Sequence, residues 1–392
     1  MMRLAVVTPI PTPYRDPFWN VVAGHPDVDG LDVYYCAKGK ADRPWTANWE
    51  MEYRAVFLPG HNLLKWRGQD ASCFWNPGIR RELRAGRYDA ILIGGYNHLT
   101  MLAAVREAIR LGVPYYLMSE TWSMRRTSVM KRLVKDPLVR WVVRNAVGTL
   151  PTGMLAERYL LMYGANPDTI VRVPNVPDID RFAQMRASEP PAELKRYGDR
   201  PVILFAARLI PKKRPQLLLQ ALHRSCGEHD AVLVIVGDGP LRAELQQTAR
   251  ALGINDRVHF AGFVEPDEMP RWYANAHVFV LPSSETWGVA VIESLASGTP
   301  VIVSDEVGCH PDVVVDAGCG DVVPAANEHE LATAIQRRCG NDSPESTFAQ
   351  FDSEAQTQFS YVRLADDLLS EIQRDPTIGS TVDRTPEQCV ES

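Results

Sequence analysis

The stretch AVLVIVGDGPLRAELQQTARALG, residues 231–253, passes from a short apolar run through a tight turn into a segment typical of a helix. The apolar run is continuous rather than alternating, which indicates a strand buried on both faces. Similar runs occupy residues 201–208, 258–263, 277–283 and 299–305. Strands of this kind that alternate with helices are typical of a parallel sheet covered on both faces by helices.

The first half of the chain repeats this pattern. Its apolar runs lie at residues 4–9, 31–36, 90–95, 114–119 and 148–152. A chain of 392 residues is also longer than one hydrophobic core usually supports. The sequence therefore predicts an α/β protein with two doubly wound, Rossmann-like domains whose parallel sheets face a central cleft.

Composition shifts suggest where the domains begin and end. The segment around 173–200 contains prolines and many charges that interrupt the periodicity. A last amphipathic segment carries apolar residues at Phe359, Val362, Leu364, Leu368 and Leu369. We expect an N-terminal Rossmann-like domain at 1–173, a linker at 174–199 and a C-terminal Rossmann-like domain at 200–353. A helix at 354–374 is a candidate to pack back on the N-terminal domain, and a disordered tail follows at 375–392.

Charge and cysteine usage restrict the class of protein. The net charge of −6 argues against a general nucleic-acid role. Seven scattered cysteines without a C-x-x-C spacing argue against a disulfide framework or a zinc site. We find neither a signal peptide nor an apolar run long enough to span a membrane. These features predict a cytoplasmic protein, with a peripheral position at the inner membrane face as an option.

Polar or glycine-rich sequence follows three strands of the second domain. The first strand leads into ARLIPKK with Arg208 and Lys213, the second into VGDGP, and the third into SSETWGVAVIE with Glu285 and Glu293. Each motif alone has an ordinary explanation as solvated loop charges, a turn, or carboxylates that suit a helix N-terminus. The carboxyl ends of parallel strands meet at one edge of a sheet, so the three together favour a ligand site.

The residue types at this edge suit one class of ligand. The two cations can bind a diphosphate, and so can the N–H groups of Gly288, Val289 and Ala290 at the start of a helix expected at 288–297. The two carboxylates, eight positions apart, can each accept hydrogen bonds from sugar hydroxyls. This combination predicts binding of a nucleotide-diphosphate sugar.

The same residues resemble a known family. The segment 200–305 is similar to the donor-binding domain of the family-4 retaining glycosyltransferases, which have the GT-B fold, through AARLIPKKR, VGDGP, AGF and ETWGVAVIESLASGTPV. Trp287 stands where that pattern usually has Phe. The resemblance implies that Arg208 and Lys213 bind the diphosphate and that Glu285 binds the donor sugar. It also implies that Glu293 binds the ribose and that the backbone of Gly262 and Phe263 contacts the base.

The resemblance also implies a reaction. A hexosyl or amino-hexosyl group would pass from a nucleotide-diphosphate sugar, by default UDP-linked, to an acceptor hydroxyl with retention of configuration. Arg208, Lys213 and Glu285 are the candidate catalytic residues, and neither a metal nor another cofactor is expected. The D-x-D pair at Asp178 and Asp180 lies in the linker and is not expected to bind metal.

The acceptor side is less specific. Its candidate residues are Tyr14, Arg15, Asp16, His98 and Glu120, and the last two have local hydrogen-bonding or capping as the alternative. A soluble metabolite such as an aminocyclitol or aminoglycoside competes as acceptor with a lipid-linked or surface polysaccharide at a membrane surface, reached through the basic segment 124–145.

Other functions also remain as alternatives. A GT-B sugar-nucleotide epimerase would share the fold and the ligand, and a non-catalytic sugar-nucleotide binding protein would share the donor site. A dinucleotide-dependent oxidoreductase is disfavoured because TPIPTPYRD replaces the expected G-x-G-x-x-G after the first strand.

Overall fold

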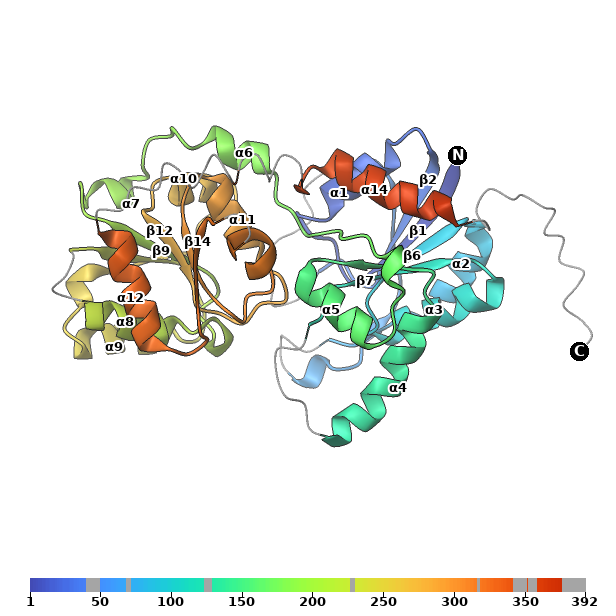
Figure 1. Cartoon of the computed structure of the whole chain (residues 1–392), viewed down its shortest axis with the longest axis horizontal. Helices are drawn as coiled ribbons and strands as arrows, with labels where there is room; N and C mark the ends of the chain where they lie inside the picture. The colour runs from blue at the N-terminus through green and yellow to red at the C-terminus, as the bar shows by residue number, and fades with distance from the viewer. Residues whose placement is uncertain are drawn as a thin grey trace, which may run out of the picture.

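The computed structural model describes residues 1–39, 50–67, 72–122, 129–225, 230–315, 318–340, 351 and 358–375, with the backbone alone for 129–134. Within these ranges the chain forms two α/β domains that lie side by side (Figure 1). A segment drawn in green crosses between them, and the final helix returns to the N-terminal domain.

The N-terminal domain contains a six-stranded sheet in the order β3-β2-β1-β6-β7-β8, and every neighbouring pair is parallel. Its strands are β1 (Met2–Thr8), β2 (Val28–Tyr35), β3 (Arg54–Phe57), β6 (Ala90–Gly94), β7 (Tyr115–Ser119) and β8 (Gly148–Pro151). A short antiparallel pair, β4 (His61–Asn62) with β5 (Phe74–Trp75), lies outside this sheet. All five predicted strands of this half are confirmed.

The C-terminal domain repeats the topology with the order β11-β10-β9-β12-β13-β14, again entirely parallel. Its strands are β9 (Val202–Ala206), β10 (Val232–Val236), β11 (Val258–Gly262), β12 (Val278–Leu281), β13 (Val301–Ser304) and β14 (Gly320–Val323). The predicted doubly wound architecture is therefore confirmed in both halves.

Helices connect most successive strands and cover the sheets. The N-terminal domain has α1 (Asp16–Ala23), α2 (Ile79–Gly86), α3 (Leu99–Leu111), α4 (Val129–Asn145) and α5 (Met154–Met162), with 3₁₀ turns at Lys65–Arg67 and Pro167–Thr169. The second half of the chain has α6 (Ile179–Gln184), α7 (Ala192–Lys195), α8 (Pro215–Ser225), α9 (Arg242–Ala251), α10 (Met269–Ala274), α11 (Val289–Ala296), α12 (Glu328–Cys339) and α14 (Tyr361–Arg374). Its 3₁₀ turns are Pro211–Lys213 and Asn255–Arg257, and a π-helical turn spans His310–Val315.

Alternate residues of the central strands enter different cores. In β1, Leu4 and Val6 belong to one apolar cluster, whereas Ala5 and Val7 belong to another on the opposite face of the sheet. All four side chains are fully buried. Burial on both faces explains why the strand reads as a continuous apolar run.

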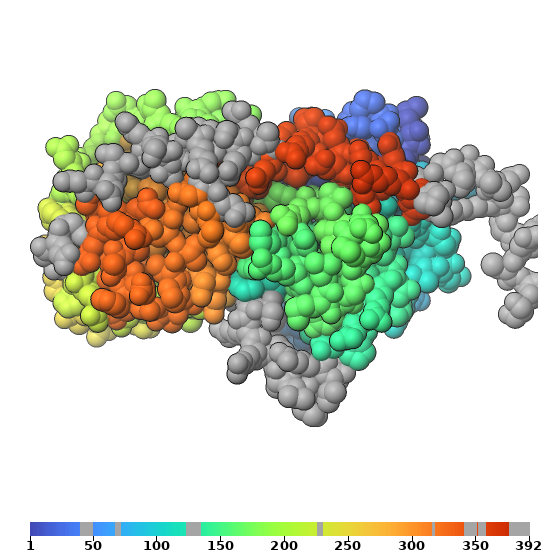
Figure 2. Space-filling model, viewed as in Figure 1, coloured from blue at the N-terminus to red at the C-terminus, as the bar shows by residue number. Residues whose placement is uncertain are grey.

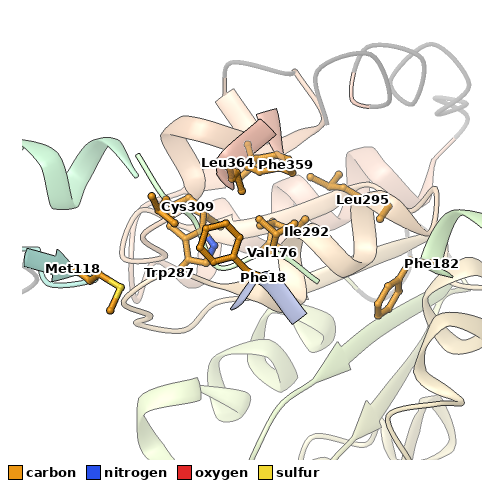
Figure 3. Packing of buried hydrophobic residues seen from close by; sticks show 14 of the residues in the cluster. Phe18, Met118, Val176, Phe182, Trp287, Ile292, Leu295, Cys309, Phe359 and Leu364 are labelled. Carbon is orange, nitrogen blue, oxygen red and sulfur yellow. The ribbon is translucent and has the colours of Figure 1, made fainter. Parts of the chain in front are cut away.

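One apolar cluster joins the two domains. Its labelled members include Phe18 and Met118 of the N-terminal domain, Val176 of the linker, and Trp287 and Cys309 of the C-terminal domain (Figure 3). Residues of both domains and of the linker therefore pack together in one apolar core.

The linker and the last helix attach to different domains. After the crossing, α6 packs on α11, and Arg186 of the same segment donates to the Ala296 carbonyl at 2.9 Å. By contrast, α14, in red in Figure 2, lies on the N-terminal domain and packs against α1. Tyr361 donates to the Val176 carbonyl at 2.6 Å, so α14 is also tied to the crossing point.

Several local expectations were wrong. The pattern did not predict β3 or β14, because β3 is half-exposed and β14 begins with a glycine and an acid. In the final helix Val362 is 60% exposed rather than part of the apolar face. The predicted tail beyond residue 375 and the part of the basic segment at 124–128 lie outside the described residues.

Candidate functional site

Each sheet has one point at which its strand order reverses. In the N-terminal sheet this point lies between β1 and β6, and in the C-terminal sheet between β9 and β12. Ligands of open α/β sheets bind outside the carboxyl ends of the strands at such a point. The loops that follow these four strands therefore define the two sides of the candidate site.

The donor side is built from the loops after β9 and β12. The 3₁₀ turn at the end of the first loop presents Lys213, whose ammonium forms an ion pair with the Glu285 carboxylate of the second loop. Ser283 donates to the same carboxylate at 2.6 Å. The structure thus brings together a predicted cation and a predicted carboxylate that are 72 residues apart in the chain.

The glycine turn after β10 supports the loop that carries Arg208. Gly237 has φ of 119°, and a Cβ atom there would lie 2.2 Å from the Ala207 carbonyl oxygen. The neighbouring backbone N–H of Leu209 donates to the Asp238 carbonyl at 2.9 Å. Only a glycine permits this approach, so the VGDGP turn fixes the course of the chain on both sides of Arg208.

Gly288 begins helix α11 in a conformation that L-residues avoid. Its φ is 120°, and a Cβ atom would lie 2.8 Å from Val307 Cγ1. The helix then starts at Val289, one residue later than predicted. The backbone N–H groups of Val289 and Ala290 are in its first turn, where intrahelical acceptors are lacking and an anion is favoured.

Glu293 lies in the second turn of α11 and faces α10. It accepts a hydrogen bond from the Tyr273 hydroxyl at 3.1 Å. Burial raises the pKa of the Glu293 carboxyl to about 7, although Tyr273 and Arg181 act in the opposite direction. A carboxyl with this pKa changes its charge close to neutral pH, and an incoming hydroxyl group would find it in either form.

The segment predicted to contact the base follows β11. The Gly262 carbonyl accepts from the Gly237 N–H at 2.6 Å, which links this segment to the VGDGP turn. Phe263 extends from the end of the strand with 59% of its side chain exposed. An exposed aromatic beside a donor loop offers a flat apolar surface to a ligand.

The acceptor side is a pocket of about 280 Å³ at the carboxyl ends of the N-terminal strands. It is lined by Thr8, Pro9, Ile10, Thr12, Tyr14, Arg15, Gly94, Gly95, Asn97, His98, Met118, Ser119, Glu120, Thr121, Thr152, Asn175 and Thr286. Thr286 belongs to the C-terminal domain and directly follows Glu285 in the chain, so the pocket opens beside the donor side.

Four of the five acceptor-side candidates line this pocket, and Asp16 does not. Asp16 is 1% exposed and accepts from the Tyr35 hydroxyl at 2.9 Å, which places it beneath the start of α1. The expectation that it faces the acceptor was wrong, because the helix turns its side chain toward β2. His98 lines the pocket but is buried, and its Nδ1 accepts from the Phe74 N–H at 3.2 Å.

The two charged candidates of the pocket contact residues around the start of the linker. Arg15 donates to the Val173 carbonyl at 3.4 Å, and burial lowers the pKa of its guanidinium while Glu120 acts to raise it. Glu120 accepts from the Asn175 side chain at 2.6 Å and from the Thr286 hydroxyl at 3.3 Å. Glu120 therefore contacts the linker and the donor-domain loop at once.

Sequence reasoning missed the tryptophans that hold the donor loop. Trp122 donates to the carbonyl oxygens of Glu285 and Thr286 at 3.2 and 3.1 Å. Trp287 donates to the Asn175 carbonyl at 2.9 Å. Trp287 replaces the Phe of the family pattern and so adds an indole N–H group. This added donor is the feature of the sequence from which the contact could have been predicted.

The described residues contain no group of three or more His, Cys, Asp or Glu side chains placed to hold a metal ion. Among the same residues, no helix has the length and apolar character needed to cross a membrane.

Comparison with known proteins agrees with this geometry. Residues 188–351 match the family model described as glycosyl transferases group 1. Residues 188–351, hereafter the group 1 domain, contain all the donor-side residues described above.

Curated relatives are similar to longer parts of the chain than the family model is. An alpha-D-kanosaminyltransferase of Streptomyces kanamyceticus is 29% identical over 253 residues, covering 60% of this chain and 63% of the relative. A GDP-mannose-dependent alpha-(1-6)-phosphatidylinositol monomannoside mannosyltransferase of Mycolicibacterium smegmatis is 33% identical over 218 residues, covering 51% and 56%. A D-inositol 3-phosphate glycosyltransferase of Streptomyces bingchenggensis is 34% identical over 195 residues, covering 46% and 42%. The chain thus covers less than two thirds of each relative's length.

Solved structures match the whole architecture. HepE of Anabaena in complex with UDP and glucose has a TM-score of 0.70 at 18% identity, covering 95% of this chain and 100% of that one. The lipopolysaccharide outer core galactosyltransferase WaaB has a TM-score of 0.69 at 15% identity, covering 95% and 99%. The group 1 domain and its N-terminal partner together form a GT-B fold.

Proposed function

We propose that this protein is a glycosyltransferase that moves a hexosyl or amino-hexosyl group from a nucleotide-diphosphate sugar to an acceptor hydroxyl. The observation that carries the proposal is the ion pair of Lys213 and Glu285 at the switch point of the group 1 domain. Both partners lie beside the loop of Arg208, and Glu285 is followed directly by Thr286 of the acceptor-side pocket. A sugar bound at Glu285 would be next to that pocket.

The ion pair gives a physical role to each partner. A diphosphate would take Lys213, and the hydroxyls of the transferred sugar would take Glu285, so donor binding exchanges one set of charge-assisted hydrogen bonds for another. Arg208, Lys213 and the N-terminus of α11 would then stabilise the negative charge that develops on the leaving nucleotide. We assign to Glu293 the ribose hydroxyls and to the backbone of Gly262 and Phe263 the base.

Retention of configuration is part of the proposal. The carboxylates of Glu285 and Glu293 are both assigned to sugar hydroxyls, so neither is assigned the role of a covalent nucleophile. A front-face route, in which the leaving phosphate takes the proton of the acceptor hydroxyl, is consistent with that assignment. The proposed nucleotide is UDP, as in HepE, whose structure contains UDP and glucose.

The acceptor has two candidate classes. Relatives include a kanosaminyltransferase and a mannosyltransferase named for a phosphatidylinositol mannoside. We favour a soluble small molecule that carries several hydroxyl or amino groups, because the pocket is small and lined by polar side chains. A lipid-linked or surface polysaccharide acceptor is the second candidate.

The test is a screen of the purified full-length chain against UDP- and GDP-sugars, each with aminoglycoside, inositol and polyprenyl-linked acceptors. Mass spectrometry would identify a product heavier than the acceptor by one hexosyl or amino-hexosyl unit. NMR of the anomeric proton would then give its configuration. Epimerised nucleotide-sugar formed without acceptor would instead support an epimerase, and binding of the donor without any turnover would support a binding protein.

A further inference from the structure

Two buried oxygen atoms of the acceptor-side pocket lack a hydrogen-bond partner. They are Thr152 Oγ1 and Asn175 Oδ1, and both residues are 2% exposed. Most buried polar atoms in folded proteins are paired, so an unpaired one calls for a physical reason. Both residues line the pocket beside Glu120. A ligand group that donates hydrogen bonds would supply the missing partners.

These atoms adjoin the Glu120 carboxylate. Asn175 uses its Nδ2 to donate to Glu120 Oε1 at 2.6 Å, which leaves its Oδ1 as the unpaired end of the amide. The backbone N–H of Thr152 donates to the Ser119 carbonyl at 3.0 Å, so Thr152 sits beside the residue that precedes Glu120. The ends of β7 and β8 and the start of the linker thus gather hydrogen-bond acceptors in one place.

We propose that Thr152, Asn175 and Glu120 form a subsite for an ammonium group of the acceptor, as carried by an amino sugar or an aminocyclitol. An ammonium has three donors and no acceptor, which matches a wall made of an amide oxygen, a hydroxyl and a carboxylate. A neutral hydroxyl group has one donor and would form fewer hydrogen bonds with these oxygens than an ammonium group. The inference rests on the proposed glycosyltransferase function and specifies its acceptor.

One other charged group lies near the subsite. Arg15 also lines the pocket, where its buried guanidinium donates to the Val173 carbonyl at 3.4 Å and interacts electrostatically with Glu120, so an ammonium at the subsite would share the Glu120 carboxylate with Arg15. His98 accepts from the Phe74 N–H, which is compatible with a neutral ring. A phosphate placed at the subsite would be repelled by the Glu120 carboxylate and attracted by Arg15, so a phosphate probe is included in the test.

Three matched probes test the subsite on the intact chain with UDP present. They are scyllo-inositol, its derivative with one hydroxyl replaced by an amine, and myo-inositol 1-phosphate, each titrated at pH 7 and followed by ligand-observed NMR. We expect the amine to bind about 10-fold more tightly than the parent cyclitol, because its hydrogen bonds are charge-assisted. Glu120→Gln should bring that ratio close to one.

Thr152→Val should weaken binding of the amine about 3- to 10-fold, the effect of one lost hydrogen bond, and Thr152→Ser should restore it. Thr149→Val is the matched control, because Thr149 Oγ1 is equally buried and unpaired but does not line the pocket. Equal effects of Thr149→Val and Thr152→Val would overturn the subsite, as would tighter binding of the phosphate or the neutral cyclitol than of the amine. If the native chain binds no nucleotide-sugar of either the UDP or the GDP series, the proposed function fails. If it binds UDP without preferring the amine, the subsite alone fails.

Discussion

The two domains share one topology but differ in what they present at the switch point. The C-terminal sheet presents an ion pair, a glycine turn and a helix N-terminus, all set by residues that match a family pattern. The N-terminal sheet presents a pocket whose side chains bond mainly to the linker or to each other. The charged groups of the C-terminal side suit the diphosphate of the proposed donor. The polar pocket of the N-terminal side suits the proposed acceptor, a ligand whose chemical structure differs from one glycosyltransferase to another.

Hydrogen bonds to the donor loop join the two sides, in addition to the shared apolar cluster and the contact of the Met154 N–H with Asp312. Glu120 and Trp122 reach Thr286 from the N-terminal domain, and Trp287 reaches Asn175 in the linker. The loop that carries Glu285 is thus positioned by both domains. A substitution in either domain that shifts this loop should therefore also change ligand binding at the other domain.

The largest expected effect comes from Glu285→Ala. Loss of the carboxylate removes the partner of Lys213 and the proposed contact to the transferred sugar, so the rate of transfer should fall about 100-fold or more. Initial rates at saturating donor would measure it. Glu330→Ala, an exposed acid on α12, is the control and should be neutral. Full activity of the Glu285 variant would remove this residue from the mechanism.

Gly153→Ala tests the contact between the domains. A Cβ atom there would lie 2.2 Å from the Trp287 ring, so the indole and the donor loop must shift. We expect a destabilisation of about 1–3 kcal/mol in denaturant unfolding, the usual range for overpacking. Gly78→Ala is the matched control, because a Cβ atom there meets no neighbouring atom within 4 Å. Equal stability of the two variants would mean that the domains separate freely.

A smaller effect should appear in the pH dependence of donor binding. In the proposed donor site, ribose hydroxyls would donate to the ionised Glu293, and its pKa of about 7 means that the carboxylate gains population as the pH rises through 7. The affinity for a UDP-sugar should therefore increase about 10-fold from pH 6 to pH 8 and then level off. Calorimetry of the native chain and of Glu293→Gln would compare the two, and the variant should show a flat profile. A slope that survives the substitution would assign the titration to another group.

The two domains also differ in how much the sequence alone could predict. Continuous apolar runs revealed the central strands of both sheets, and charged residues at strand ends placed Lys213 and Glu285 at one ligand site, although their ion pair was not predicted. The Tyr35 contact that turns Asp16 away from the pocket depends on packing between α1 and β2 and leaves no local pattern. The unpaired oxygens of Thr152 and Asn175 likewise arise only when the strand end and the linker meet.

The most direct test of the central claim compares the two adjacent lysines of the 3₁₀ turn after β9. Lys213 pairs with Glu285, whereas Lys212 has an exposed side chain. Calorimetric titration with the UDP-sugar found in the screen should show that Lys213→Ala binds it about 10- to 100-fold more weakly, while Lys212→Ala binds it as the native chain does. Equal affinity of both variants and the native chain would contradict a donor site at this switch point.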